Sequence, residues 1–222
     1  MDTRGAPLRL RRRGPRRVGR PSRPVPNEAL LAVARSAFAA SGYGGTSLDT
    51  LASRTGLRKP SLLHRFPSKQ ALYAAVLGEL VADLGALIRD ARLDEGGFVE
   101  RLDRLGELIV RHLGAHPDAG RLLLREALDR GPFMHSGGRA AILAALRAAA
   151  EFLAAGMKAG FFARQDPLQL VLSILGVHLL YFAVGDVSGE LLGEDALALP
   201  AVERRVAALC AHVRRLVLRL PP

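Results

Sequence analysis

Apolar residues recur every three to four positions along most of this chain, and short stretches rich in glycine, proline or polar residues interrupt them. That spacing places apolar side chains on one face of a helix, whereas a half-buried strand would alternate strictly. A first helix is predicted after Pro26, with an apolar stripe from Leu30 to Phe38, and Gly42 ends it. Further helices are predicted at residues 69–90, 98–113, 117–130, 138–160, 167–184 and 200–219.

Two short helices are predicted between the first helix and residue 69. Thr46 is placed to cap the first of them, and Gly56 ends it. Pro60 opens the second, because proline is tolerated in a first helical turn, and Pro67 stops it. Ser68 then caps the long helix that follows. Together with the scarcity of strand-forming residues, this predicts an all-α fold of nine helices.

The second short helix has one apolar and one polar face. Leu62 and Phe66 are four residues apart and point together toward a core. The opposite side carries Pro60, Ser61, Leu63 and His64. Two short helices joined by a glycine-containing turn form a helix-turn-helix, whose second helix presents a polar face to DNA. We therefore interpret this stretch as a DNA-reading surface.

The stretch "GYGGTSLDTLASRTGLRKPSLLHRFPSKQALYAAVL", residues 42–77, closely resembles the DNA-binding segment of the TetR family of bacterial transcriptional regulators. The resemblance implies a nine-helix protein with two parts, a helix-turn-helix domain over residues 26–70 and a ligand-binding and dimerisation domain over residues 71–222. It also implies a homodimer that binds a pseudo-palindromic double-stranded DNA operator. Such a protein is usually a repressor that a small ligand releases.

The family pattern assigns roles to individual positions. Contacts with DNA phosphates are implied for Thr46, Ser47 and Lys69. Contacts with base edges or the flanking backbone are implied for Arg58, Lys59, Ser61 and His64. Pro60 stands where the family often has glycine and faces a thymine methyl group in this interpretation. Leu63 stands where the family commonly has a tyrosine that contacts a phosphate. Thr46, Ser47 and Ser68 are equally ordinary helix caps, and the choice between Arg58 and Lys59 as the base reader stays open.

The net charge of +11 is concentrated at the N-terminus. Residues 1–25 hold nine arginines and one acid, Asp2, and so carry eight of the eleven net positive charges. With few apolar groups, this segment is predicted to be a disordered basic arm that seeks polyanions. Arg20, between Gly19 and Pro21, resembles the arginine of minor-groove arms. The alternatives are an inert tail, or a protein whose arm binds nucleic acid or anionic surfaces without sequence preference.

The later helices are predicted to enclose a mainly apolar pocket for an unidentified small-molecule effector. Its candidate lining residues are Tyr73, His112, Arg125, Phe133, Met134, His178 and Tyr181. The resemblance implies that helices eight and nine, residues 167–184 and 200–219, form the dimer interface. Residues 167–184 are nearly long enough to span a membrane, but polar residues interrupt them, so we interpret them as a buried interface helix.

No catalytic, cofactor-binding or metal-binding motif is recognised in the chain. His112 and His116 are four residues apart, but Gly114 and Pro117 interrupt a helix there, and a zinc-protease motif would need Glu at position 113. The single cysteine, Cys210, excludes an internal disulfide. We expect a cytoplasmic regulator without a cofactor and without enzymatic activity.

Overall fold

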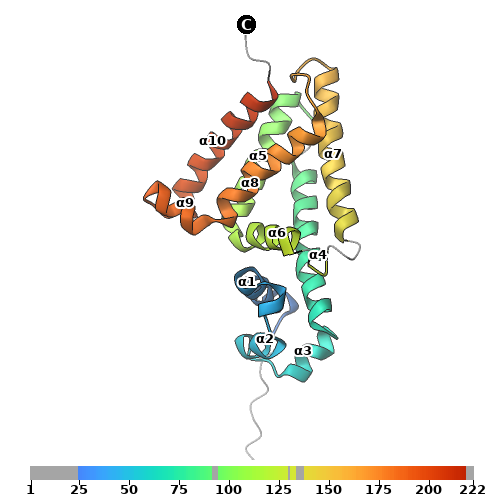
Figure 1. The fold of residues 1–222 in the computed structure, drawn as a ribbon, viewed down its shortest axis with the longest axis vertical. Helices are drawn as coiled ribbons and strands as arrows, with labels where there is room; N and C mark the ends of the chain where they lie inside the picture. The colour runs from blue at the N-terminus through green and yellow to red at the C-terminus, as the bar shows by residue number, and fades with distance from the viewer. Residues whose placement is uncertain (1–24, 92–94, 130, 134–137, 219–222) are drawn as a thin grey trace, which may run out of the picture.

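The computed structural model describes residues 25–91, 95–129, 131–133 and 138–218. Within these ranges all regular structure is helical, which confirms the predicted all-α fold. The helices form a small part and a larger body, joined by one long helix (Figure 1). The small part contains α1 (Asn27–Gly45), α2 (Leu48–Thr55) and α3 (Lys59–Arg65). The linking helix is α4 (Lys69–Asp90).

In the part of the chain that the structure describes, the body is built from six further helices. They are α5 (Phe98–Ala115), α6 (Pro117–Asp129), α7 (Gly138–Lys158), α8 (Pro167–Ala183), α9 (Gly185–Leu192) and α10 (Leu199–Val217). α6 lies across the junction with the small part and packs against α1 (Figure 1). α5 packs against both α8 and α10, so these three helices share one core.

Local sequence signals explain several helix boundaries. Gly42 interrupts α1 with φ of +71°, a left-handed conformation that glycine adopts at little cost. Ser68 caps α4, because its hydroxyl accepts a hydrogen bond from the Ala71 amide at 3.0 Å. Asp166 caps α8 in the same way, and Pro167 follows as the first helical residue. The predicted starts of α4 and α8 are confirmed, whereas α1 is interrupted at its predicted end, Gly42, but continues to Gly45.

The described residues contain ten helices, and the prediction of nine missed α9. α9 follows α8 at a bend of 80° near Val184 and ends at Gly193, which has φ of +69°. None of its residues is buried, and Val187 and Leu191 are exposed. Because a sequence pattern reveals a helix through its buried stripe, a short helix without one escapes it. The predicted ninth helix corresponds to α10.

Among the helices of the described residues, α4 and α7 are long and apolar enough to cross a membrane. α8 and α9 reach that length only if the bent pair is counted as one span. In the fold, α4 packs against α1, α5 and α7, and α7 packs against α4 and α8. Leu72, Val76 and Leu80 of α4 are buried in these contacts. The apolar side of α4 therefore has protein partners along both parts of the molecule.

Candidate nucleic-acid interface and body cavity

Buried leucines and a glycine turn hold α2 and α3 against α1. Leu51 of α2 and Leu62 of α3 are fully buried, and Leu57 between the two helices packs against the same core. Gly56 ends α2 with φ of +68°, and its amide donates hydrogen bonds to carbonyls of the last turn. The pair therefore forms the predicted helix-turn-helix, with α3 as its second helix.

The outer face of α3 carries the residues that the sequence assigned to DNA. Five of them are exposed, namely Arg58, Lys59, Pro60, Ser61 and His64, and Leu63 is half-buried. The Lys59 ammonium lies 2.8 Å from a carboxylate oxygen of Asp49 in α2. Both side chains of this pair are exposed, so the interaction is weak and Lys59 can exchange it for another anion.

Ser47, and not Thr46, caps α2, so the predicted cap is wrong by one residue. The Ser47 hydroxyl accepts a hydrogen bond from the Thr50 amide at 3.0 Å and lies on the surface. Thr46 is buried, and its hydroxyl is directed at the carbonyl oxygens of Gly42, at 2.9 Å, and Ala37, at 3.2 Å. The Thr46 side chain therefore fastens α2 to the end of α1 and has no free face for a phosphate.

Lys69 also has a structural partner that the sequence did not reveal. Its ammonium donates hydrogen bonds to the carbonyl oxygens of Tyr43, at 2.9 Å, and Thr46, at 3.1 Å. It lies 4.3 Å from the centre of the Tyr43 ring, within the range of a cation–π contact. Lys69 thus ties the start of α4 to the junction of α1 and α2.

Arg65 holds the end of α3 and was missed by the sequence analysis. Its guanidinium donates hydrogen bonds to the Val25 carbonyl at 2.5 Å and to the side chain of Asn27 at 3.2 Å. These bonds join the last turn of α3 to the start of α1, about forty positions earlier in the chain. Because the two ends of this contact are so far apart in the sequence, no pattern of neighbouring residues predicts it.

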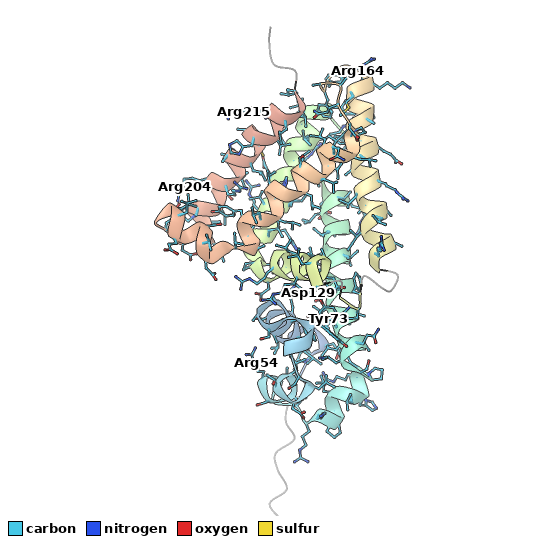
Figure 2. All side chains as sticks on the ribbon, viewed as in Figure 1. Arg54, Tyr73, Asp129, Arg164, Arg204 and Arg215 are labelled. Carbon is cyan, nitrogen blue, oxygen red and sulfur yellow. The ribbon has the colours of Figure 1, made fainter. Side chains whose placement is uncertain are left out.

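Two predicted ligand residues, Tyr73 and Arg125, instead bridge the small part and the body. The Tyr73 hydroxyl in α4 donates a hydrogen bond to Glu126 of α6 at 2.5 Å, and both side chains are buried. Burial and this bond to a carboxylate raise the pKa of Tyr73. Figure 2 shows Tyr73 close to Asp129, where α4 passes α6. Arg125 donates to the Ala40 carbonyl in α1 at 3.3 Å.

The remaining candidates in this half of the body do not form one site. The rings of His112 and His116 are 4.9 Å apart, and burial, followed by the neighbouring His116, lowers the pKa of His112. Phe133 is buried, and Met134 lies outside the described residues. Across the described ranges, no cluster of three or more His, Cys, Asp or Glu side chains is arranged to hold a metal ion.

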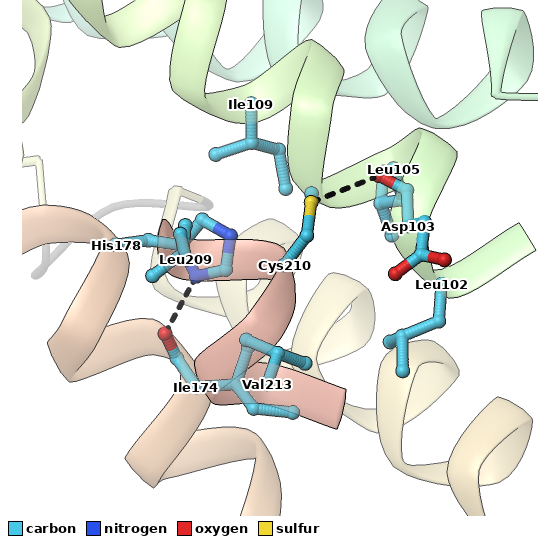
Figure 3. A pocket seen from close by; sticks show the side chains of 10 residues that line it. Leu102, Asp103, Leu105, Ile109, Ile174, His178, Leu209, Cys210 and Val213 are labelled. Carbon is cyan, nitrogen blue, oxygen red and sulfur yellow. Dashed lines mark hydrogen bonds between the residues drawn. The ribbon is translucent and has the colours of Figure 1, made fainter. Parts of the chain in front are cut away.

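His178 lines a hollow of about 50 Å³ between α5, α8 and α10 (Figure 3). Its Nδ1 lies 2.7 Å from the Ile174 carbonyl oxygen. Cys210 of α10 lines the same space, as does Asp103 of α5. Tyr181 does not line it, and its hydroxyl donates a hydrogen bond to the Ala196 carbonyl at 3.2 Å. Of the predicted ligand residues that the structure describes, only His178 lines this hollow, whereas Tyr73 and Arg125 lie where α6 meets α4 and α1, and His112 lies beside His116.

Comparison with known proteins places the chain in one family. Residues 30–76 match the family described as "Bacterial regulatory proteins, tetR family", and residues 99–213 match "Tetracyclin repressor-like, C-terminal domain". The HTH-type transcriptional regulator RutR of Escherichia coli K12 is 30% identical over 194 residues, which cover 84% of this chain and 90% of RutR. The chain belongs to the TetR family of bacterial regulators.

Solved structures of TetR-family proteins share its fold. AibR, crystallised in complex with isovaleryl coenzyme A and operator DNA, superposes with a TM-score of 0.71 at 17% identity, covering 84% of this chain and 96% of AibR. The ketosteroid transcriptional regulator KstR2 of Mycobacterium tuberculosis gives 0.69 at 19% identity, covering 87% and 95%. At these identities the likeness shows the fold alone.

As a member of the TetR family, this protein is a helix-turn-helix transcriptional regulator that binds DNA. The N-terminal match spans α2 and α3, and the C-terminal match spans most of the body. The matched families are families of regulators and not of enzymes. The exposed face of α3 lies within the N-terminal match.

Proposed function

We propose that this TetR-family protein is a homodimeric repressor that binds a pseudo-palindromic operator and is released by a small, mainly apolar ligand. The observation that carries the proposal is the exposed face of α3, which is held in place by Leu51 and Leu62. In each subunit α3 enters a major groove, and the two grooves lie about 34 to 36 Å apart. The operator symmetry then follows from the symmetry of the dimer.

The DNA contacts that we propose come from α3 and from the start of α2. Residues that meet base edges or the adjoining backbone are Arg58, Lys59, Pro60, Ser61, Leu63 and His64. Ser47 contacts a phosphate together with the N-terminal amides of α2, which favour anions. Lys69 contributes its remaining N–H, since two are directed at backbone carbonyls. Thr46 supports this surface from beneath and does not contact DNA through its side chain.

The dimer forms through α8 and α10 in this proposal. The exposed side of α8 repeats every four residues as Leu168, Leu172, Gly176 and Leu180, and the three leucines are 54–59% exposed. α10 places the small residues Ala208 and Ala211 on its exposed side. Burying a leucine side chain contributes about 1.5 to 3 kcal/mol, so this stripe on two subunits supplies a substantial part of an interface. Four such helices form a bundle around the two-fold axis.

We also propose which part of the chain binds DNA and which part binds the ligand and the partner subunit. Residues 26–70 bind DNA, residues 71–222 bind the ligand and the partner subunit, and α4 connects them. The arginines of residues 1–25, including Arg20, lie outside the described residues, and we assign them a general attraction for DNA on their charge alone. We assign the protein to the cytoplasm and none of its helices to a membrane, because its proposed partner is operator DNA.

The proposal is tested by selecting, from random duplex DNA at near-physiological salt, the sequences that the purified protein binds. The selection is then repeated with a protein that lacks residues 1–25. We expect one pseudo-palindrome to be enriched by both forms, because the specific contacts come from α3. If no sequence emerges and DNA retention vanishes without residues 1–25, the alternative holds, and the arginines bind nucleic acid or anionic surfaces without sequence preference. Sedimentation at micromolar concentration tests the dimer, and a monomer would contradict it.

A further inference from the structure

The hollow between α5, α8 and α10 contains a buried polar atom without a partner. His178 is 5% exposed, and its Nε2 has no hydrogen-bonding partner among the described residues. Buried polar atoms in proteins normally have a hydrogen-bonding partner. An unpartnered Nε2 therefore suggests that a further group binds there. Figure 3 shows the His178 ring and the Cys210 sulfur facing the same space.

The hydrogen bonds of His178 determine what Nε2 can do. The Ile174 carbonyl is only an acceptor, so the His178 Nδ1 at 2.7 Å carries the proton. Burial, and then the nearby Arg205, lower the pKa of His178, so its imidazole is neutral. In a neutral imidazole protonated on Nδ1, Nε2 is a hydrogen-bond acceptor. A partner of the His178 Nε2 must therefore be a hydrogen-bond donor.

The rest of the lining sets the polarity of that partner. Most of the surrounding side chains are apolar, among them Leu102, Ile109 and Leu209. Asp103 is paired with Arg214, at 2.9 Å between the carboxylate and the guanidinium Nε, so it is not available to balance a cation. An anion would face the lone pair of Nε2, which repels it. The lining therefore suits a neutral molecule.

The size of the hollow limits what it encloses. Its volume is about 50 Å³, roughly one third of the 150 Å³ cavity that holds a benzene molecule. Gly106 of α5 leaves the space open, because a Cβ at that position would lie 3.8 Å from the His178 Nε2 and 3.9 Å from the Cys210 Sγ. A group of a few non-hydrogen atoms fits beside Gly106, either as a whole molecule or as the end of a longer one.

We propose that this hollow is an effector subsite that binds a small neutral, mainly apolar compound donating one O–H or N–H hydrogen bond to the His178 Nε2. Its role as an effector site rests on the proposed function. α8 and α10 both line the hollow and both carry the proposed dimer interface, so a bound molecule changes how these two helices pack. Repacking there alters the angle between the subunits and hence the separation of the two α3 helices.

The binding test uses the full-length protein labelled with ¹⁵N in its histidines, without DNA. 2-Propanol and acetone have the same carbon count and nearly the same shape, but only 2-propanol donates a hydrogen bond. We expect 2-propanol to shift the Nε2 resonance of His178 in a saturable way, and acetone to bind at least about tenfold more weakly, because it leaves Nε2 unsatisfied. Equal shifts from both compounds, or none from either, would overturn the proposed site.

Two variants and one matched control make the test specific. Gly106→Ala places a methyl group in the hollow at ordinary contact distances, so the protein folds while 2-propanol binding falls by at least about tenfold. Gly78→Ala makes the same change in α4, where nothing lies within 4 Å of the added methyl, and leaves binding unchanged. His178→Phe keeps a ring in place and removes the acceptor. Because it also removes the reporting imidazole, its binding is followed through the backbone amide resonances of uniformly ¹⁵N-labelled protein, where we expect the preference for 2-propanol over acetone to be lost.

The effect of 2-propanol on DNA binding is measured separately, with the operator obtained by selection. We expect 2-propanol to weaken operator binding by the wild-type protein and by Gly78→Ala, but not by Gly106→Ala. If the compound binds and operator affinity stays the same in all three, the hollow is not an effector site. If no operator is obtained, the proposed function fails, while the NMR titration still decides whether the hollow binds its ligand.

Discussion

Tyr73→Phe tests the contact between the linking helix α4 and helix α6 of the body. The substitution removes only the hydroxyl that donates to Glu126, since phenylalanine keeps the ring. The ring contacts with Phe38, at 4.8 Å between centroids, and with Tyr43, at 5.0 Å, are preserved. Any change in stability then reports on one hydrogen bond between α4 and α6.

The expected effect follows from the burial of both partners. Tyr73 and Glu126 are each 2% exposed, so water does not replace the lost donor. A hydrogen bond to a charged group contributes about 1.5 to 3 kcal/mol, and Glu126 keeps other interactions, so we expect the free energy of unfolding to fall by about 2 kcal/mol. For a regulator of ordinary stability this is a large fraction of the total.

The same bond predicts a dependence on alkaline pH. Because the pKa of Tyr73 is raised in the folded protein, folding favours the neutral phenol. That contribution is fully present below the unfolded pKa of about 10 and is lost as pH rises above it toward the raised folded value. The stability difference between wild type and Tyr73→Phe should therefore shrink above pH 10, while it stays constant between pH 7 and about 9.

The assay is urea unfolding followed by circular dichroism, at one protein concentration because a dimer gains stability with concentration. A double-mutant cycle with Glu126→Gln isolates the pair, and we expect a coupling energy of at least about 1 kcal/mol. A loss below about 0.5 kcal/mol for Tyr73→Phe, or no coupling, would refute the role that we give this bond.

Three further predictions concern the DNA-binding surface and the dimer. His64→Ala should weaken binding to the selected operator by about 1 to 3 kcal/mol in fluorescence anisotropy, and an equal loss on random DNA would show that His64 does not contact bases. Thr46→Val should lower the free energy of unfolding by about 1 to 2 kcal/mol and leave the operator affinity of the folded protein within about 0.5 kcal/mol. A loss of affinity as large as that of Ser47→Ala would mean that Thr46 touches DNA. Leu172→Glu should yield monomers in sedimentation velocity at micromolar concentration, because it buries an unpaired charge, whereas a dimer of unchanged strength would place the interface elsewhere.

The helix-turn-helix was predictable because its signals are local. Gly56 and Pro60 mark helix boundaries through their own backbone preferences, and Leu62 reveals the buried face of α3 through its spacing from Phe66. These properties act within one or two helical turns, so they can be recognised in the chain before it folds. Exposure of the outer face of α3 then follows from the burial of the inner one.

The cap of α2 shows where local signals become ambiguous. Thr46 and Ser47 are both good capping residues, and the sequence does not say which hydroxyl faces the Thr50 amide. The end of α1 decides, because the carbonyls of Ala37 and Gly42 attract the Thr46 hydroxyl inward. The choice depends on where α1 places those carbonyls.

The sequence by itself determined the helical class, the reading helix and the family, since these depend on periodicity and on residues close together in the chain. Only the tertiary structure decided which polar residues meet. Tyr73 and Glu126 are 53 positions apart, and His178, Gly106 and Cys210 come from three different helices. An apolar helix looks the same in sequence whether a polar residue on it faces a ligand, a carboxylate or a backbone carbonyl. The packing of the helices makes that choice, because it sets which buried group each polar atom can reach.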